Sequence, residues 1–307
     1  MAPSKADLLP TSPGIDTVDV IAAQQHYLTI ELIPPGCGRD AADVNGDNVI
    51  NTVDVFAIQR FFIGRTFGLA NVGKYKFTPA SRTYTGVVTD QTNQDYDTLV
   101  FGDIVGNFVH RPEGLSQSAA GDGTSVSALS GLNPSAREVP ATVAVVALPE
   151  VVVDQLRTPK NSRGQVLSRV QSKGNFIAAV RTSVIDAKNK LVGFQGDFTF
   201  DERVVTFQSE PVQNAGLTAG NWNVSGNVLP GAGPMRTLRI SAYSNDFTPL
   251  SGEGTLFELN MTRVSEAAQS TSLTWAAPPN NFIFIDADLN TQKPGKAAAG
   301  NVEALKR

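Results

Sequence analysis

Six residues near the N-terminus have the types and spacing of a calcium-binding loop. In a loop of the EF-hand kind, Ca²⁺ takes oxygen ligands from positions 1, 3, 5, 7, 9 and 12. Counted from the first carboxylate, these positions hold Asp43, Asn45, Asp47, Val49, Asn51 and Asp54. Val49 would contribute its backbone carbonyl and Asn51 could act through water, while the other side chains supply hard oxygen atoms. We therefore predict that this loop binds Ca²⁺.

Two positions of this loop depart from the usual pattern. Position 6, where the chain turns sharply and glycine is usual, holds Asn48. Asparagine tolerates the left-handed backbone conformation better than other non-glycine residues, so we expect a positive φ angle there. Position 12 holds Asp54 instead of glutamate, so this carboxylate stands on a shorter side chain. We expect it to remain a ligand.

The loop leads into the second copy of an internal repeat. Residues 15–28 recur as residues 50–63, and half of the positions are identical. In both copies apolar residues follow at the spacing of one helical face; they are Val20, Ala23 and Tyr27 in the first copy and Val55, Ile58 and Phe62 in the second. Gly64 ends the second helix. The repeat predicts two loop–helix units within residues 1–70.

The loop in front of the first helix lacks most of its ligands. Counting back from Asp19 places positions 1, 3 and 5 on Leu8, Pro10 and Ser12, none of which carries a carboxylate. Asp16 and Asp19 remain at positions 9 and 12 as candidate ligands. Whether this first loop binds Ca²⁺ stays open.

A short segment further along, residues 102–107, resembles the start of a calcium loop. Its sequence is Gly-Asp-Ile-Val-Gly-Asn, and no ligands follow it in the chain. We interpret it as a turn. It closes residues 71–110, where short β-type runs alternate with Asn, Asp and Gly turns and predict a small β-hairpin extension.

The second half of the chain has the pattern of an all-β domain. Phe194, Phe198 and Phe200 alternate with polar residues, and residues 237–242 and 257–262 alternate in the same way. This period of two predicts a two-sheet sandwich over residues 142–287. Residues 111–141 are rich in Ser, Gly and Pro and predict a linker. Residues 288–307 are expected to form a C-terminal tail.

The two halves resemble two known families. Tandem loop–helix units without the entering helix of an EF-hand resemble a dockerin, most clearly over residues 43–64. The order of phrases at residues 193–201, 204–207 and 249–257 resembles a cohesin. The resemblance implies a mainly β fold with a small α calcium-loop module, in which a dockerin-like pair of loop–helix units precedes a cohesin-like β-sandwich (jelly roll).

The dockerin resemblance also implies a role and a set of contact residues. Dockerins fold with calcium and bind the β-sandwich of a cohesin through loop positions 10 and 11 and helix positions 17 and 18. In this chain those positions are Thr17, Val18, Gln24 and Gln25 in the first copy and Thr52, Val53, Gln59 and Arg60 in the second.

Composition excludes several other functions. The net charge is −4, which argues against nucleic-acid binding, and no apolar run is long enough to span a bilayer. With only two histidines, and no Ser-His-Asp order or phosphate loop, we expect no enzyme. No secretory signal follows Met1, which fits either a mature chain whose signal peptide is absent or a cytosolic protein. The family resemblance leads us to expect a secreted or cell-surface protein.

The resemblance leaves the binding partner open. The dockerin-like half of one chain could dock on the cohesin-like half of the next and build a ring or an extracellular filament. It could also close onto its own chain, or bind a foreign scaffold. A carbohydrate-binding sandwich, anchored through the dockerin-like part, is a further alternative. The basic segment 157–173 is either a solvated loop or a surface for an acidic partner.

Overall fold

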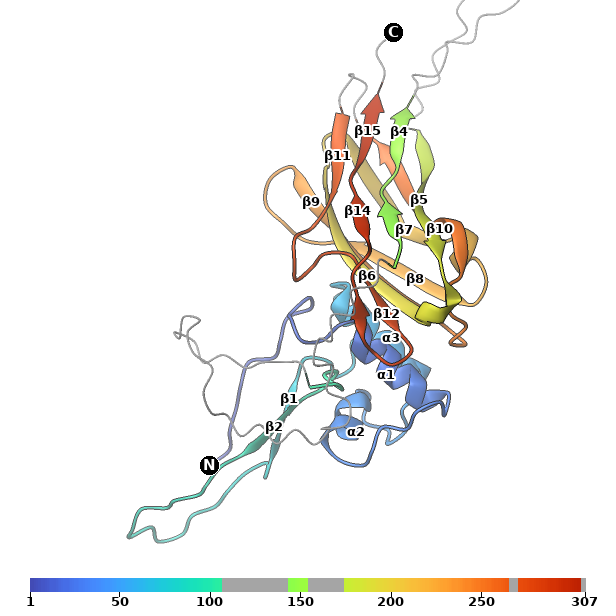
Figure 1. Ribbon diagram of the computed structural model, residues 1–307. Helices are drawn as coiled ribbons and strands as arrows, with labels where there is room; N and C mark the ends of the chain where they lie inside the picture. The colour runs from blue at the N-terminus through green and yellow to red at the C-terminus, as the bar shows by residue number, and fades with distance from the viewer. Residues whose placement is uncertain (107–142, 154–173, 265–269, 305–307) are drawn as a thin grey trace, which may run out of the picture. The chain divides into compact units, whose positions relative to one another are not determined.

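The computed structural model describes residues 1–106, 143–153, 174–264 and 270–304 (Figure 1). The chain divides into two units, Met1–Ser135 and Ala136–Arg307. The expected linker, residues 111–141, and the basic segment, residues 157–173, lie outside the described residues. Among the residues that the structure does describe, no helix is both long and apolar enough to cross a membrane.

The first unit is built on two helices that pack against each other, α1 (Thr17–Tyr27) and α3 (Thr52–Phe62), with the short α2 (Cys37–Ala42) between them in the chain (Figure 1). Each long helix begins with a reciprocal capping box, in which the N-cap residue is Asp16 for α1 and Asn51 for α3. Such a cap stabilises a helix by about 1 kcal/mol. The two helices predicted from the repeat therefore pack together in this unit.

A β-hairpin completes the first unit. Strands β1 (Tyr75–Thr78) and β2 (Asp97–Val100) pair antiparallel. Hydrogen bonds tie its base to the helical part, because the Asn71 backbone N–H donates to the Val44 carbonyl and the Leu8 N–H donates to the Gly73 carbonyl. Gly73 has a φ of 84°, and a Cβ there would lie 2.6 Å from the Phe61 ring. The hairpin is therefore part of the helical module.

The second unit is a sandwich of two β-sheets. Within the described residues, one sheet has the order β14 (Lys296–Ala298), β3 (Val145–Ala147), β5 (Asn175–Ile185), β10 (Gly252–Arg263) and β7 (Val205–Asn214). The other follows the order β13 (Thr291–Gln292), β12 (Ile283–Asp286), β6 (Leu191–Asp201), β11 (Ser270–Trp275), β15 (Gly300–Ala304) and β4 (Glu150–Val153). Strand β9 (Met235–Ser244) pairs with β6 of this second sheet, and β8 (Trp222–Val228) pairs with the other edge of β9.

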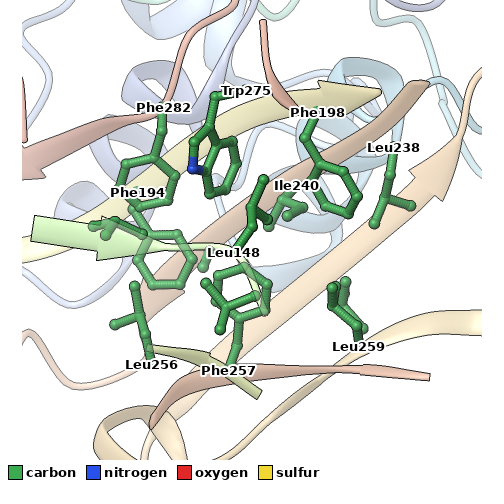
Figure 2. Close-up of a cluster of buried hydrophobic side chains, with 14 of the residues drawn as sticks. Leu148, Phe194, Phe198, Leu238, Ile240, Leu256, Phe257, Leu259, Trp275 and Phe282 are labelled. Atoms are coloured by element: carbon green, nitrogen blue, oxygen red, sulfur yellow. The ribbon is translucent and has the colours of Figure 1, made fainter. Parts of the chain in front are cut away.

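The core between the sheets is aromatic. Strand β6 directs Phe194, Phe198 and Phe200 inward, as the alternation predicts, and all are fully buried. The Phe194 ring lies 5.6 Å from Phe257 and 5.7 Å from Phe282, and Figure 2 shows these rings among the aliphatic side chains of both sheets. Such ring pairs add about 0.5–1.5 kcal/mol to the burial of their apolar area. The mainly β sandwich expected from the sequence is confirmed.

The prediction of a C-terminal tail is wrong for residues 291–304. Strand β14 pairs parallel with β3, β15 pairs parallel with β4 and antiparallel with β11, and β13 pairs with β12. Gly300 allows close approach, because a Cβ there would lie 2.3 Å from the Pro149 carbonyl oxygen. These strands are short and rich in Ala, Gly and polar residues, so their strand state depends on neighbours far away in the chain and leaves little local signal.

Candidate calcium loops and docking surface

The second loop is folded around its first carboxylate. Asp43 Oδ1 accepts hydrogen bonds from the backbone N–H groups of Gly46 at 2.8 Å and Asp47 at 3.1 Å. Asp43 Oδ2 accepts one from the Asn48 N–H at 2.8 Å, and Asn45 Oδ1 accepts another from the Asp47 N–H at 2.9 Å. The side chains at positions 1 and 3 therefore point into the turn, where an ion would be held.

The backbone of this loop also has the expected turn. Asn48, at position 6, has a φ of 67°, which confirms the predicted left-handed conformation. Gly46 at position 4 has a φ of 76°. Two left-handed residues within three positions curl the chain tightly enough to bring its oxygen atoms to one side.

Asp54 connects the start of the loop to helix α3. Its Oδ1 accepts hydrogen bonds from the Val44 N–H at 3.0 Å and the Asn45 N–H at 3.2 Å, and its Oδ2 accepts one from the Asn51 N–H at 3.0 Å. Burial raises the pKa of the Asp54 carboxyl, the hydrogen bonds from Asn51 and Asn45 lower it, and the nearby charge of Asp43 raises it further. A cation near this pair would therefore favour the ionised forms.

The donor set fits Ca²⁺ better than a transition metal. Within the described ranges, no three His, Cys, Asp or Glu side chains lie close enough together to hold a metal by themselves. An ion in the second loop would need the carboxamides of Asn45 and Asn51 and the Val49 carbonyl as well as the carboxylates. All of these donors are oxygen atoms, which calcium takes in sets of six to eight.

The residues that precede helix α1 in the chain do not fold into the first half of a calcium loop. The Leu8 N–H donates to the Gly73 carbonyl and the Thr11 N–H to the Phe61 carbonyl, so this stretch is engaged elsewhere. Asp16 and Asp19 do lie together at the start of α1, where the Asp16 N–H donates to Asp19 Oδ2 at 2.9 Å.

The remaining oxygen of Asp19 faces a distant segment. Its Oδ1 accepts hydrogen bonds from the backbone N–H groups of Ile104 at 2.8 Å and Val105 at 3.1 Å. Residues 102–106 are therefore more than the simple turn that we expected. The sequence of residues 102–107, which resembles the start of a calcium loop, was the signal from which this contact could have been predicted. Its partner Asp19 is 85 positions away in the chain, so no local pattern links the two.

The expected docking positions differ between the two copies. Thr17, Val18, Gln24 and Gln25 of the first copy are buried in the structure. In the second copy Thr52, Val53 and Arg60 are exposed, whereas Gln59 is buried. Only the second copy therefore presents most of its expected contact residues on the surface.

Helix α3 has exposed apolar side chains opposite its packed side, because Val53 is 54% and Phe56 42% exposed. Two more large apolar side chains are exposed at its ends, Val49 in the preceding loop at 57% and Phe67 after the helix at 61%. The Arg60 guanidinium lies over the Phe67 ring at 5.7 Å. We call Val49, Val53, Phe56, Arg60 and Phe67 the docking stripe. The sequence reasoning missed Phe56 and Phe67, although Val53, Phe56 and Arg60 have the i, i+3, i+7 spacing of one helical face.

Within its described residues, the sandwich does not present the aromatic platform expected of a sugar-binding domain. Trp222 and Trp275 belong to the hydrophobic core, and Tyr243 is buried. Burial also raises the pKa of the Tyr243 hydroxyl. On the same sandwich, the Glu258 carboxylate accepts a hydrogen bond from the Gln213 side-chain amide at 2.7 Å. These residues have structural roles in the described part of the sandwich.

Comparison with known proteins gives matches of fold alone. No family model matches the chain, and no curated protein matches it either. Solved structures do match, and what they share is the cohesin sandwich. The type I Coh-OlpA–Doc918 cohesin–dockerin complex from Clostridium thermocellum has 12% identity and a TM-score of 0.39, covering 53% of this chain and 99% of that chain.

Cohesin modules from other bacteria give similar values. A type III cohesin of a cell-surface anchoring scaffoldin from Ruminococcus flavefaciens has 8% identity and a TM-score of 0.35, covering 54% of this chain and 89% of its own. A cohesin of a Clostridium perfringens family 33 glycoside hydrolase has 11% identity and a TM-score of 0.36, with 54% and 100% covered. At these values the similarity assigns no role to any individual residue of this chain.

Proposed function

We propose that this protein is a non-catalytic, calcium-dependent protein–protein interaction protein, in which the loop–helix module of one copy docks on the β-sandwich of another. The observation that carries this proposal is the docking stripe. Large apolar side chains exposed together on one helical face are a common mark of an interaction surface.

The stripe is not needed to hold the module together. Helix α3 already packs through Val55, Ile58, Phe61 and Phe62, all of which are buried. Val53 and Phe56 lie on the opposite side and remain exposed. Burying one such side chain against a partner contributes about 1.5–3 kcal/mol, so a few of them are enough to drive association. An aromatic residue stacked under an arginine also suits the centre of an interface.

Calcium would connect the loop to this surface. Val49 lies within the second loop, and Val53 lies in the first turn of α3, beside the candidate ligand Asp54. When bound, Ca²⁺ would supply positive charge to the carboxylates of Asp43, Asp47 and Asp54 and so stabilise the loop. Because the loop carries part of the stripe, docking should weaken when calcium is removed.

The presence of two different halves in one chain supports self-assembly as the form of docking. A module and a sandwich in one polypeptide present two different surfaces, so their contact between copies is heterologous and builds rings or filaments. A secreted or cell-surface location, where calcium is abundant enough for weak loops, suits this role. Trp222 and Trp275 lie in the core and are not offered to a sugar, which favours protein docking over carbohydrate binding.

Sedimentation velocity on the full chain tests the proposal. With calcium we expect sedimentation coefficients that rise with protein concentration, and with a chelator we expect a return to the monomer. Val53→Asp should weaken association about tenfold or more, since it removes a buried apolar contact at the interface. The matched control is Val88→Asp, because Val88 is equally apolar and 91% exposed but lies in the β1–β2 connection, away from the stripe.

The other outcomes are also informative. A chain that stays monomeric at high concentration in calcium contradicts self-assembly. A monomer that is compact in calcium and expands with chelator indicates docking within one chain. Equal loss of association in the Val53 and Val88 variants would exclude the docking stripe as the contact surface.

A further inference from the structure

Residues 103–106 repeat the geometry of the start of the second loop. The Ile104 and Val105 N–H groups donate to Asp19 Oδ1 at 2.8 and 3.1 Å. In the second loop the Val44 and Asn45 N–H groups donate to Asp54 Oδ1 at 3.0 and 3.2 Å. Asp19 and Asp54 are equivalent residues of the repeat. Residues 104 and 105 therefore make the same backbone hydrogen bonds to the start of the first helix as residues 44 and 45 make to the start of the second.

The backbone and the burial match as well. Asp103 and Asp43 are each followed three residues later by a glycine with positive φ, 71° at Gly106 and 76° at Gly46. Ile104 and Val44, which follow these aspartates, are both fully buried.

Gly102 explains how a remote segment can reach this place. Its φ is 95°, and a Cβ there would lie 2.7 Å from a Val72 methyl group and 3.5 Å from Ile15. A side chain at this position would therefore push residues 103–106 away from the start of α1. Ile15 belongs to the first loop, so the glycine brings the two segments into direct contact.

The second oxygen of Asp19 also matches that of Asp54. The Asp16 N–H donates to Asp19 Oδ2 at 2.9 Å, and the Asn51 N–H donates to Asp54 Oδ2 at 3.0 Å. Both carboxylates are completely buried. Asp16 and Asp103 lie near enough to Asp19 for their charges to repel its carboxylate, and a divalent cation among carboxylates removes such repulsion.

We propose that the first loop is a second divalent-cation site assembled from two segments, with residues 103–105 as its first half and residues 14–19 as its second half. Asp103 takes the place of position 1, Asp16 that of position 9 and Asp19 that of position 12. As in the second loop, these carboxylates do not hold an ion by themselves in the described residues, so backbone carbonyl oxygens of the two segments would complete the set. Oxygen donors of this kind suit Ca²⁺. The proposal rests on the proposed function, since the same ion fills both loops.

In the assembled site, the β1–β2 hairpin has a structural role. The hairpin carries the chain from residue 73 to residue 102, and so delivers Asp103 to the helix that begins at residue 17. A module cut at residue 70 would contain both helices and lack half of one loop. A segment that contains both sites therefore has to extend from residue 14 to at least residue 105.

Native mass spectrometry of the full chain, after removal of metal and addition of Ca²⁺, tests this proposal. The wild type should carry one ion for each loop. Asp103→Asn should lose the ion of the first loop and Asp43→Asn that of the second, while the double variant should bind none. The matched control is Asp90→Asn, an exposed aspartate in the hairpin connection, which should bind as the wild type does. Calorimetric titration of the same proteins should show the same losses.

Each loop acts as a folding control for the other. If Asp103→Asn retains the ion of the second loop, the module is folded and the lost ion belongs to the first loop. The proposal is overturned if the wild type binds a single ion that Asp43→Asn removes, or if Asp103→Asn binds as much calcium as the wild type. If Asp43→Asn leaves binding unchanged, the second loop, and with it the proposed function, fails.

Discussion

The carboxylate of Asp19 accepts a hydrogen bond from the Ile104 backbone N–H at 2.8 Å, although 85 positions separate the two residues in the chain. The bond is buried, and the Val105 N–H adds a second one to the same oxygen. A buried carboxylate that loses its donors has to give up its charge or expose itself to water. The hairpin base therefore stabilises the start of α1, whether or not an ion is present.

Replacement of Ile104 by proline should destabilise the first unit. Ile104→Pro removes the N–H that donates to Asp19, and leaving a buried acceptor short of a donor costs about 1–3 kcal/mol. Urea denaturation followed by far-ultraviolet circular dichroism would measure the loss. Val87→Pro, at an exposed position in the β1–β2 connection, is the control and should change little. Equal effects of both substitutions would contradict a specific role for the Ile104 amide.

The left-handed turn at Asn48 should control the calcium affinity of the second loop. With a φ of 67°, this position favours glycine or asparagine. We expect Asn48→Gly to bind calcium about as well as the wild type. Asn48→Val should weaken binding about tenfold, because a β-branched residue in this conformation costs on the order of 1–2 kcal/mol. Calorimetric titration distinguishes the two, and equal affinities would show that the loop adopts another backbone when it binds the ion.

The buried ion pair between Asp197 and Arg239 should be sensitive to the loss of one partner. The guanidinium donates to both carboxylate oxygens, at 2.9 and 2.8 Å, and both side chains are about 5% exposed. Arg239→Met leaves a buried carboxylate without its cation and should cost about 3–5 kcal/mol in the free energy of unfolding. Arg203→Met is the control, since the Arg203–Asp201 pair is exposed on its arginine side, and its loss should have little effect.

The stability of the first unit should depend on pH through His26. The Ile33 N–H donates to His26 Nδ1 at 2.9 Å, which requires the neutral imidazole. Burial, and then the charge of Arg39, lower the pKa of His26 below its ordinary value of 6.5. The unfolded chain then takes up the proton first. The free energy of unfolding should therefore be highest above pH 6.5 and fall as the pH is lowered towards the pKa of the folded state.

His26→Gln should remove this part of the pH dependence. Denaturation curves of the wild type and the variant, measured across this range, give the difference directly. An imidazole titration by NMR that places the pKa of folded His26 at or above 6.5 would contradict the prediction.

The sequence by itself determined the features whose parts lie close together in the chain. The second loop was readable because all its donors fall within one twelve-residue pattern, and Asn48 occupies the one place that needs a positive φ. The strand that contains Phe194, Phe198 and Phe200 could also be predicted from neighbouring residues alone, since successive strand residues face opposite sides of a sheet.

Only the tertiary structure decided what surrounds each copy of the repeat. Thr17-Val18 and Thr52-Val53 are the same dipeptide, and each begins a helix after a capping box, yet the first pair is buried and the second exposed. Local sequence specifies the cap and the helix, which depend on residues a few positions apart. Burial, the meeting of Asp19 with Ile104 and the pairing of β14 with β3 depend on chain segments brought together by folding, and no local pattern records them.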